Sequence, residues 1–140
     1  MDVLLSIRPE YADAILNGTK RYEFRRIPFV RPDITTIYLY ASSKVRRIVG
    51  CFEVDGVYRG SPEAIWERCR EHAGISMEDF LRYFEGCSHA CAIGVRNPVR
   101  FPEPVDPRAV MTGFTPPQSF RYLQSNWLER RGSFSAGCGQ

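Results

Sequence analysis

The stretch GTKRYEFRR, residues 18–26, holds the side chains with the clearest potential for chemistry. Its first glycine suits the end of a helix, so Lys20 is expected at a fixed place in the turn between that helix and a strand. The following residues alternate with the period of a strand, which puts Arg21, Glu23 and Arg25 on one face. A carboxylate between two guanidinium groups can hold planar hydrogen-bonding partners, and arginine suits phosphate groups and base edges. The alternative is an exposed edge strand whose charges keep it soluble and unpaired.

The distribution of charge is compatible with an anionic partner. The chain of 140 residues has a formal net charge of +3 and a pI of about 8.7. Residues 20–31 contain five cations and one carboxylate, whereas residues 63–85 contain six carboxylates and three arginines. A second cationic cluster follows at Lys44, Arg46 and Arg47. This mild excess is far from that of a histone-like protein, and it does not by itself establish a nucleic-acid partner.

The elements that must position these side chains follow from periodicity and from helix caps. Serine and proline residues mark helix starts, glycines mark helix ends, and β-branched and aromatic runs mark strands. Strands are predicted at residues 2–7, 20–26, 34–42, 45–60 and 89–101. Helices are predicted at residues 9–17, 61–72 and 76–85, with a Pro-rich connector at 102–108 and a short helix within FTPPQSFRYL, residues 114–123.

This order of elements lacks regular βαβ alternation. It therefore predicts an α+β fold with a small, curved, largely antiparallel sheet or barrel. The length suits one domain, which we place at residues 1–128, and residues 129–140 lack periodicity and are expected to form a flexible tail.

Three segments together resemble the ASCH domain family of the PUA-like superfamily. The first, LLSIRPEYADAILNGTKRYEFRR, contains the pattern Gly-x-Lys-x-x-Glu-x-Arg, and YLYASSKVRRIVGCFEV and FTPPQSFRYL are similar to later segments of that family. The resemblance implies a PUA-like β-barrel, mostly antiparallel and flanked by helices, with a cleft beside the helix–strand turn. It implies that the cleft residues are Lys20, Glu23 and Arg25, with Ser6, Arg8, Ser42 and Ser43 nearby, and Gln118 and Ser119 at the start of the last helix.

Because the superfamily is associated with RNA, the resemblance implies a nucleic-acid-binding module that recognises a nucleotide. The partner would be RNA, another single-stranded nucleic acid or a nucleotide-like ligand. The physical chemistry agrees, since Glu23 and Arg25 offer acceptors and donors to a base, and Tyr22, Tyr38 and Tyr40 could stack on one if they are not core residues.

A hydrolase is the alternative from another class. Some ASCH proteins resemble amidohydrolases that act on a modified nucleoside, and others resemble nucleases. The amidohydrolase pattern has a threonine three positions after the lysine, where this chain has Glu23. A Lys20–Glu23 pair could still perform acid–base chemistry on a phosphodiester if burial brings both pKa values toward neutrality. A regulatory domain is a third possibility.

No cofactor is expected. A zinc site can be written from Cys69, His72, Cys87 and Cys91, but the spacing is loose and buried thiols commonly behave as small apolar groups. The five cysteines form no framework typical of secreted proteins, and no apolar run approaches the roughly 20 residues that a membrane span needs. A cytoplasmic protein without a membrane partner is therefore expected.

Overall fold

One curled sheet of six strands organises the molecule, with strand order β2-β5-β4-β3-β1-β6. The computed structural model describes residues 1–130, and the expected tail falls largely outside them. The strands are β1 (Asp2–Ile7), β2 (Tyr22–Arg25), β3 (Thr36–Ala41), β4 (Arg47–Gly60), β5 (Ala90–Val105) and β6 (Phe120–Leu123). The helices are α1 (Pro9–Leu16), α2 (Pro62–Cys69), the 3-10 turn η1 (Arg70–His72), α3 (Met77–Tyr83), α4 (Pro107–Val110) and α5 (Trp127–Arg130).

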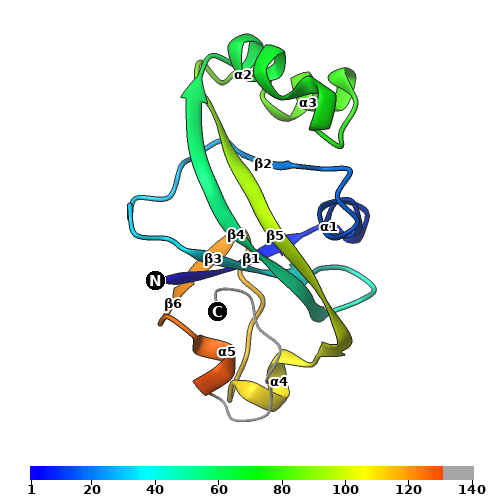
Figure 1. Cartoon of the computed structure of the whole chain (residues 1–140), viewed down its shortest axis with the longest axis vertical. Helices are drawn as coiled ribbons and strands as arrows, with labels where there is room; N and C mark the ends of the chain where they lie inside the picture. Colours follow the sequence, from blue (N-terminus) through cyan, green and yellow to red (C-terminus); the bar gives the residue numbers. More distant parts are fainter. Residues whose placement is uncertain (131–140) are drawn as a thin grey trace.

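The strand pairing confirms the expected α+β fold. All neighbouring strands are antiparallel except β1 and β3, which run parallel. The long strands β4 and β5 arch through the molecule and carry α2 and α3 at one end, while α4 and α5 lie at the other (Figure 1). The sheet curls into a half-barrel, and β2 and β6 are its two edge strands.

Local capping explains where the helices begin. The side chains of Ser61 and Ser76 accept hydrogen bonds from Ala64 N and Asp79 N, both at 3.1 Å, and so satisfy free N–H groups in the first turns of α2 and α3. Pro9 begins α1, where its missing N–H costs nothing. These starts agree with the sequence-based predictions.

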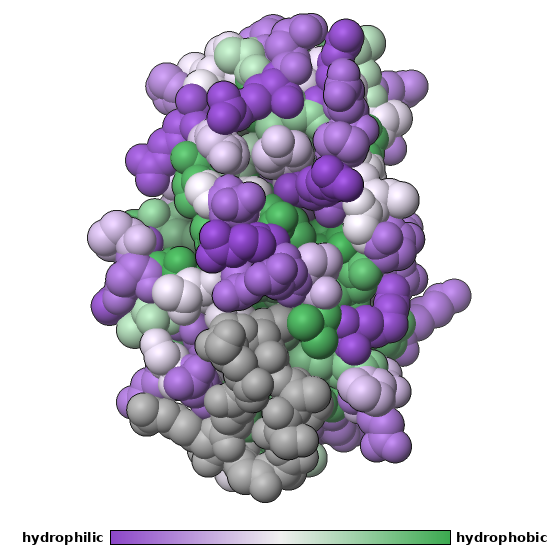
Figure 2. Space-filling model, in the orientation of Figure 1, coloured by the Kyte–Doolittle hydropathy of each residue, from purple (hydrophilic) through white to green (hydrophobic). Residues whose placement is uncertain are grey.

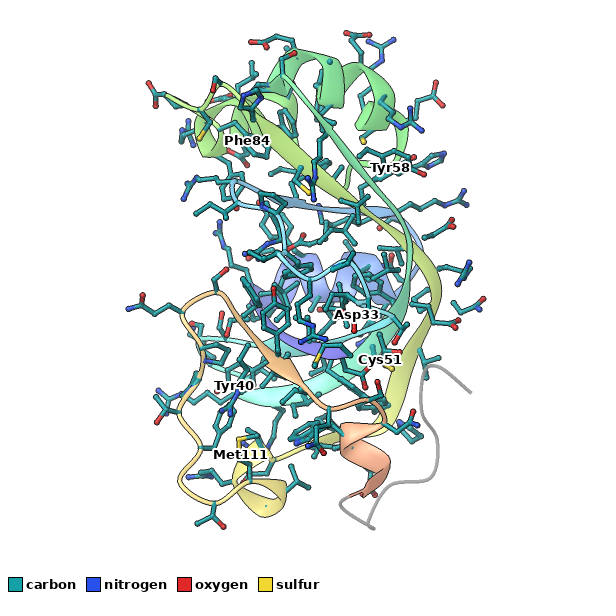
Figure 3. The ribbon with its side chains drawn as sticks, turned by 90° about the vertical axis from the view of Figure 1, so that its left-hand side faces the viewer. Asp33, Tyr40, Cys51, Tyr58, Phe84 and Met111 are labelled. Atoms are coloured by element: carbon teal, nitrogen blue, oxygen red, sulfur yellow. The ribbon has the colours of Figure 1, made fainter. Side chains whose placement is uncertain are left out.

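Three apolar clusters lie against different parts of the sheet. The first packs α1 into the curl, the second lies toward α4 and α5, and the third fills the space under α2 and α3. In Figure 3, Phe84 of the third cluster lies near the upper helices, and Tyr40 and Met111 of the second lie at the opposite end. Strand β2 separates two clusters, because Phe24 faces the third whereas Glu23 pairs with Ile93 of the first.

Two segments differ from the sequence-based prediction. FTPPQSFRYL does not form a helix: its first residues are a loop, and Phe120–Leu123 form β6, paired with the edge of β1. The predicted connector at 102–108 is wrong in its first part, because β5 continues through Pro102 and Pro104 to Val105. Prolines are tolerated there because β2 pairs with β5 only between Cys91 and Gly94, so the far part of β5 lacks β2 as a neighbour.

The exposed surface is largely hydrophilic in the view of Figure 2, with smaller apolar areas between the charged side chains. Within residues 1–130, no helix is long and apolar enough to cross a membrane.

Candidate functional site

Lys20 occupies a turn whose backbone is held from two sides. Its N–H donates to Ala14 O of α1 at 2.9 Å, and the N–H of Arg21 donates to His72 O of η1 at 2.8 Å. Gly18, with φ of +90°, lets the chain leave α1 toward β2. The predicted helix–strand turn is therefore confirmed, and it directs the Lys20 side chain into the interior, where only 2% remains exposed.

The ammonium of Lys20 lies among acceptors and aromatic rings. Nζ donates to Ala73 O at 2.8 Å and lies 3.9 Å from Glu23 Oε1. It also lies 4.6 Å from the ring centroid of Phe24 and 5.3 Å from that of Tyr11, within the range of cation–π attraction. These contacts compensate for part of the hydration that the buried ammonium has lost.

Burial shifts the pKa values of this pair toward each other. Burial raises the pKa of Glu23, although the charges of Lys20 and Arg25 oppose the shift. Burial lowers the pKa of Lys20, and the charge of Glu23 opposes that shift. Both changes make proton transfer at neutral pH easier than for the same groups in water, which is the property of a general acid or base.

Arg25 joins the two edges of the half-barrel. Its Nη2 donates to Ser119 Oγ at 3.0 Å, just before β6, and its Nε donates to Ile27 O at 3.1 Å. The guanidinium lies 4.8 Å from the ring centroid of Phe29 and 4.6 Å from that of Phe120. The side chain is thus fixed across the gap between β2 and β6.

Ser6 belongs to the same junction. Its backbone N–H donates to Ser119 O at 2.8 Å, and its hydroxyl donates to Pro117 O at 2.6 Å. The structure therefore brings together Ser6, Arg25 and Ser119, which are far apart in the sequence.

The other residues implied by the resemblance lie around this junction or away from it. Arg8 is exposed, pairs with Glu10 at 2.9 Å and lies over the ring of Tyr11. Ser42 and Ser43 form the turn after β3, where the Ser42 hydroxyl donates to Ile7 O at 3.1 Å. Among the contacts of residues 1–130, none links these two serines to Lys20 or Glu23.

Gln118 requires a correction. The resemblance implies that Gln118 lies with Ser119 at the start of the last helix. Both residues instead form a bend in the loop before β6. Ser119 O accepts a hydrogen bond from Ser6 N of β1, and no helix begins at either residue, so this loop offers no helix N-terminus.

Sequence reasoning missed Tyr11 and Tyr83, which interact electrostatically with Glu23, and Ala73, whose carbonyl oxygen accepts a hydrogen bond from Lys20 Nζ. Tyr83 of α3 accepts a hydrogen bond from Arg26 Nε through its carbonyl oxygen at 2.8 Å, and the Arg26 guanidinium lies 4.2 Å from its ring centroid. Burial, with a smaller effect from Glu23, raises the pKa of Tyr83. The sequence pattern placed Tyr11 and Tyr83 on the apolar faces of two helices, but nothing in it indicated that either residue lies near Glu23. We call Tyr11, Lys20, Glu23, Arg25 and Tyr83 the Glu23 site.

The tyrosines and cysteines considered above are mostly structural. Tyr38 and Tyr40 are buried in the second apolar cluster, while Tyr22 packs edge-on against Tyr58. Cys69 and Cys87 belong to the third cluster, whereas Cys91 belongs to the first. Within the described part of the chain, no three His, Cys, Asp or Glu side chains gather as metal ligands would.

Two hollows lie beside the Glu23 site. The larger, of about 510 Å³, is bounded by the turn at Lys20 and Arg21, by His72 and by Tyr58 of β4. The smaller, of about 340 Å³, lies at the far end of β2 beside Arg26 and Cys91. Neither hollow is lined by Glu23 or Arg25.

Comparison with known proteins gives consistent results. Residues 5–100 match the family model of the ASCH domain. The ASCH domain-containing ribonuclease of Zymomonas mobilis is 31% identical over 134 residues, covering 92% of this chain and 88% of that protein. The crystal structure of ASCH from Zymomonas mobilis superposes with a TM-score of 0.86 at 28% identity, covering 98% of this chain and 97% of that one. A tyrosine-to-phenylalanine variant of that protein gives 0.86 at 26% identity, covering 96% and 99%.

Proposed function

Because this chain belongs to the ASCH domain family, we propose that it is a ribonuclease that cleaves single-stranded RNA at the Glu23 site. A relative that bears the name ribonuclease supports an RNA-related role. Single-stranded RNA fits because its backbone can bend to present a 2′-hydroxyl to a localised group, whereas a duplex holds that hydroxyl in a fixed geometry. The proposal is the hydrolase alternative raised by the sequence, with RNA as substrate.

The buried Lys20–Glu23 pair is the observation that carries this proposal. A carboxylate with a raised pKa beside a lysine with a lowered pKa is costly to maintain in an apolar setting. Such a pair is well suited to acid–base catalysis, because the best catalytic pKa lies near the working pH.

Exposure separates the roles of the two side chains. The Glu23 side chain is 14% exposed, whereas that of Lys20 is 2% exposed and donates to Ala73 O. Glu23 is therefore the group that contacts RNA, and Lys20 is a positioning residue that holds and tunes it. Arg25 lies beside Glu23 and supplies fixed positive charge near the phosphate.

In the proposed reaction, Glu23 accepts the proton of a ribose 2′-hydroxyl. The 2′-oxygen then bonds to the adjacent phosphorus as the bond from phosphorus to the 5′-oxygen breaks, and the departing oxygen takes a proton from water or a neighbouring group. The products are a 2′,3′-cyclic phosphate and a free 5′-hydroxyl. The step consumes no cofactor or co-reactant.

RNA binding without cleavage is the second candidate. Lys20 Nζ and the Arg25 guanidinium already donate hydrogen bonds within the protein. This favours a structural role for the two cations over a role in cleaving RNA. Buried ion pairs of this kind can also be purely structural. In this case the same surface would recognise a nucleotide and leave the phosphodiester intact.

A cleavage assay on a single-stranded RNA decamer separates the candidates. We expect Glu23→Gln to lower kcat/KM by at least about 100-fold, the usual contribution of a general base. The matched control is Glu67→Gln, at an exposed position of α2. Mass spectrometry should detect the cyclic phosphate.

Binding is measured in parallel with a 2′-O-methyl decamer, which lacks the attacking hydroxyl. Salt-dependent binding without cleavage by the wild-type protein would replace the ribonuclease proposal by the binding module. Wild-type protein that neither cleaves nor binds would reject both candidates.

A further inference from the structure

The smaller hollow, at the end of β2, has a cationic rim over an apolar floor. Its volume is about 340 Å³, and its charged or ionisable rim consists of Arg26, Arg59 and His89. Ile27, Pro28, Ala90 and Cys91 complete the lining. None of these described lining residues is Asp or Glu, so the hollow contains no acidic side chain to balance its cations.

The strand register places two lining residues of this hollow, Cys91 and Arg59, on the same face of the sheet as Glu23. Cys91 of β5 is the partner of Arg25 on one side and of Arg59 on the other. The three residues therefore form one row across β2, β5 and β4. The Cα atoms of Arg25 and Arg59 are about 10 Å apart, which is two strand spacings. Glu23 lies two residues before Arg25 and thus on the same face of β2.

The side chains of the rim differ in how they are held. Arg26 is fixed on α3, because its Nε donates to Tyr83 O and its guanidinium covers the Tyr83 ring. Arg59 is exposed and interacts with the sulfur of Cys91. Burial raises the pKa of that thiol, so it stays neutral and adds no negative charge beneath Arg59. None of the ion pairs of residues 1–130 involves Arg26 or Arg59, so both guanidinium groups keep their positive charge uncompensated for an anion.

The larger hollow has a different character. Asp55 lies in its wall, 3.7 Å from Arg96, and its two tyrosines pack against each other. Part of its positive charge is therefore already compensated. The smaller hollow is the better match for a group of purely negative charge.

We propose that the hollow formed by Arg26, Arg59 and His89 binds a phosphate group of the RNA strand, on a nucleotide next to the one held at the Glu23 site. This inference rests on the proposed action on RNA and extends it by naming where the strand continues. Arginine binds phosphate through two parallel N–H donors, and His89 adds a further N–H donor. The apolar floor accommodates the sugar or base of the same nucleotide.

The test measures binding of the 2′-O-methyl decamer by fluorescence anisotropy over a range of salt concentrations. The variants of the full chain are Arg59→Ala and Arg59→Ala with His89→Ala. The matched control is Arg108→Ala, which also removes one cation but lies on α4 at the opposite end of the molecule (Figure 1). Circular dichroism and thermal unfolding verify that each variant is folded.

We expect Arg59→Ala to weaken binding by about tenfold, because an arginine–phosphate contact is a charge-assisted hydrogen bond. The slope of log Kobs against log salt should become shallower by about 0.7 for each lost phosphate contact on a single strand. The double variant should show a larger loss, and Arg108→Ala should bind as the wild type does.

Unchanged affinity and slope in the double variant, with salt-dependent binding by the wild type, would overturn the inference. An equal loss in Arg108→Ala would do so as well, because it would show a general effect of net charge. The 2′-O-methyl strand cannot be cleaved by the proposed route, so failure of catalysis does not affect this result. A protein that binds through Arg59 but never cleaves RNA would refute the ribonuclease proposal and support this subsite.

Discussion

Replacing Lys20 by methionine tests whether this buried cation controls the protonation of Glu23. Methionine keeps an unbranched stem in the space against Gly74, where a Cβ would overlap the Lys20 side chain, and removes only the charged end. At the separation of 3.9 Å between Nζ and Glu23 Oε1, two unit charges interact by about 4 kcal/mol at an effective dielectric constant of 20. Because the Glu23 side chain is 14% exposed, solvent screens part of this interaction, and we expect its loss to raise the pKa of Glu23 further.

The consequence for stability depends on pH. A carboxyl group whose pKa is raised in the folded state favours folding below its unfolded pKa of about 4.3, and this contribution is lost as the pH rises through the folded pKa. In Lys20→Met that loss grows, because the ionised Glu23 carboxylate no longer has the Lys20 ammonium 3.9 Å away. The variant should therefore approach wild-type stability at acidic pH, where Glu23 is neutral, and fall about 2–3 kcal/mol below it at pH 8.

Two measurements check this reasoning. Carbon-13 NMR of the Glu23 carboxyl group gives its pKa directly, and urea unfolding at pH 5 and pH 8 gives the difference in stability. Lys44→Met is the matched control, since Lys44 is exposed and is the only other lysine of the sequence. If Glu23 is the catalytic base, the acidic limb of the pH–rate profile should shift to higher pH as the pKa of Glu23 rises. A Glu23 pKa that does not rise in a folded Lys20→Met variant would refute the argument.

Two further substitutions examine the packing that supports the site. Arg25→Ala should lower the free energy of unfolding by about 3 kcal/mol, because it removes hydrogen bonds and ring contacts across the two sheet edges. If the edges then separate, amide hydrogen exchange at Phe120 should become faster. Unchanged protection of Phe120 would contradict the idea that Arg25 holds β2 and β6 together. Gly74→Ala should cost about 2–4 kcal/mol, from a positive φ and from overlap with the Lys20 stem. At Gly113 φ is also positive, but no atom lies within 4 Å of the added Cβ, so Gly113→Ala should lower the free energy of unfolding by only about 1 kcal/mol. Equal melting temperatures of the two glycine variants would show that overlap with the Lys20 side chain does not destabilise Gly74→Ala.

Local sequence signals predicted most of the elements, because they depend on neighbouring residues. Ser61 and Ser76 cap α2 and α3 as expected, and the glycine at position 18 ends α1 before the turn to Lys20. The segment FTPPQSFRYL was misjudged because a four-residue edge strand such as β6 exists only through its pairing with β1. No residue pattern within the segment indicates that it pairs with β1.

Residue types and their spacing are enough to identify the candidate side chains and to place Glu23 and Arg25 on one face of a strand, because side chains alternate along a strand. Three features arise only when the whole chain packs: Lys20 is buried against Ala73 O, burial shifts the pKa values of Lys20 and Glu23 toward each other, and Arg25 reaches Ser119, 94 residues away. Likewise, only the register of β2, β5 and β4 aligned Arg59 with Arg25. The reason is physical: desolvation and contacts between distant residues arise from the packed chain as a whole, whereas periodicity and capping act within a few residues.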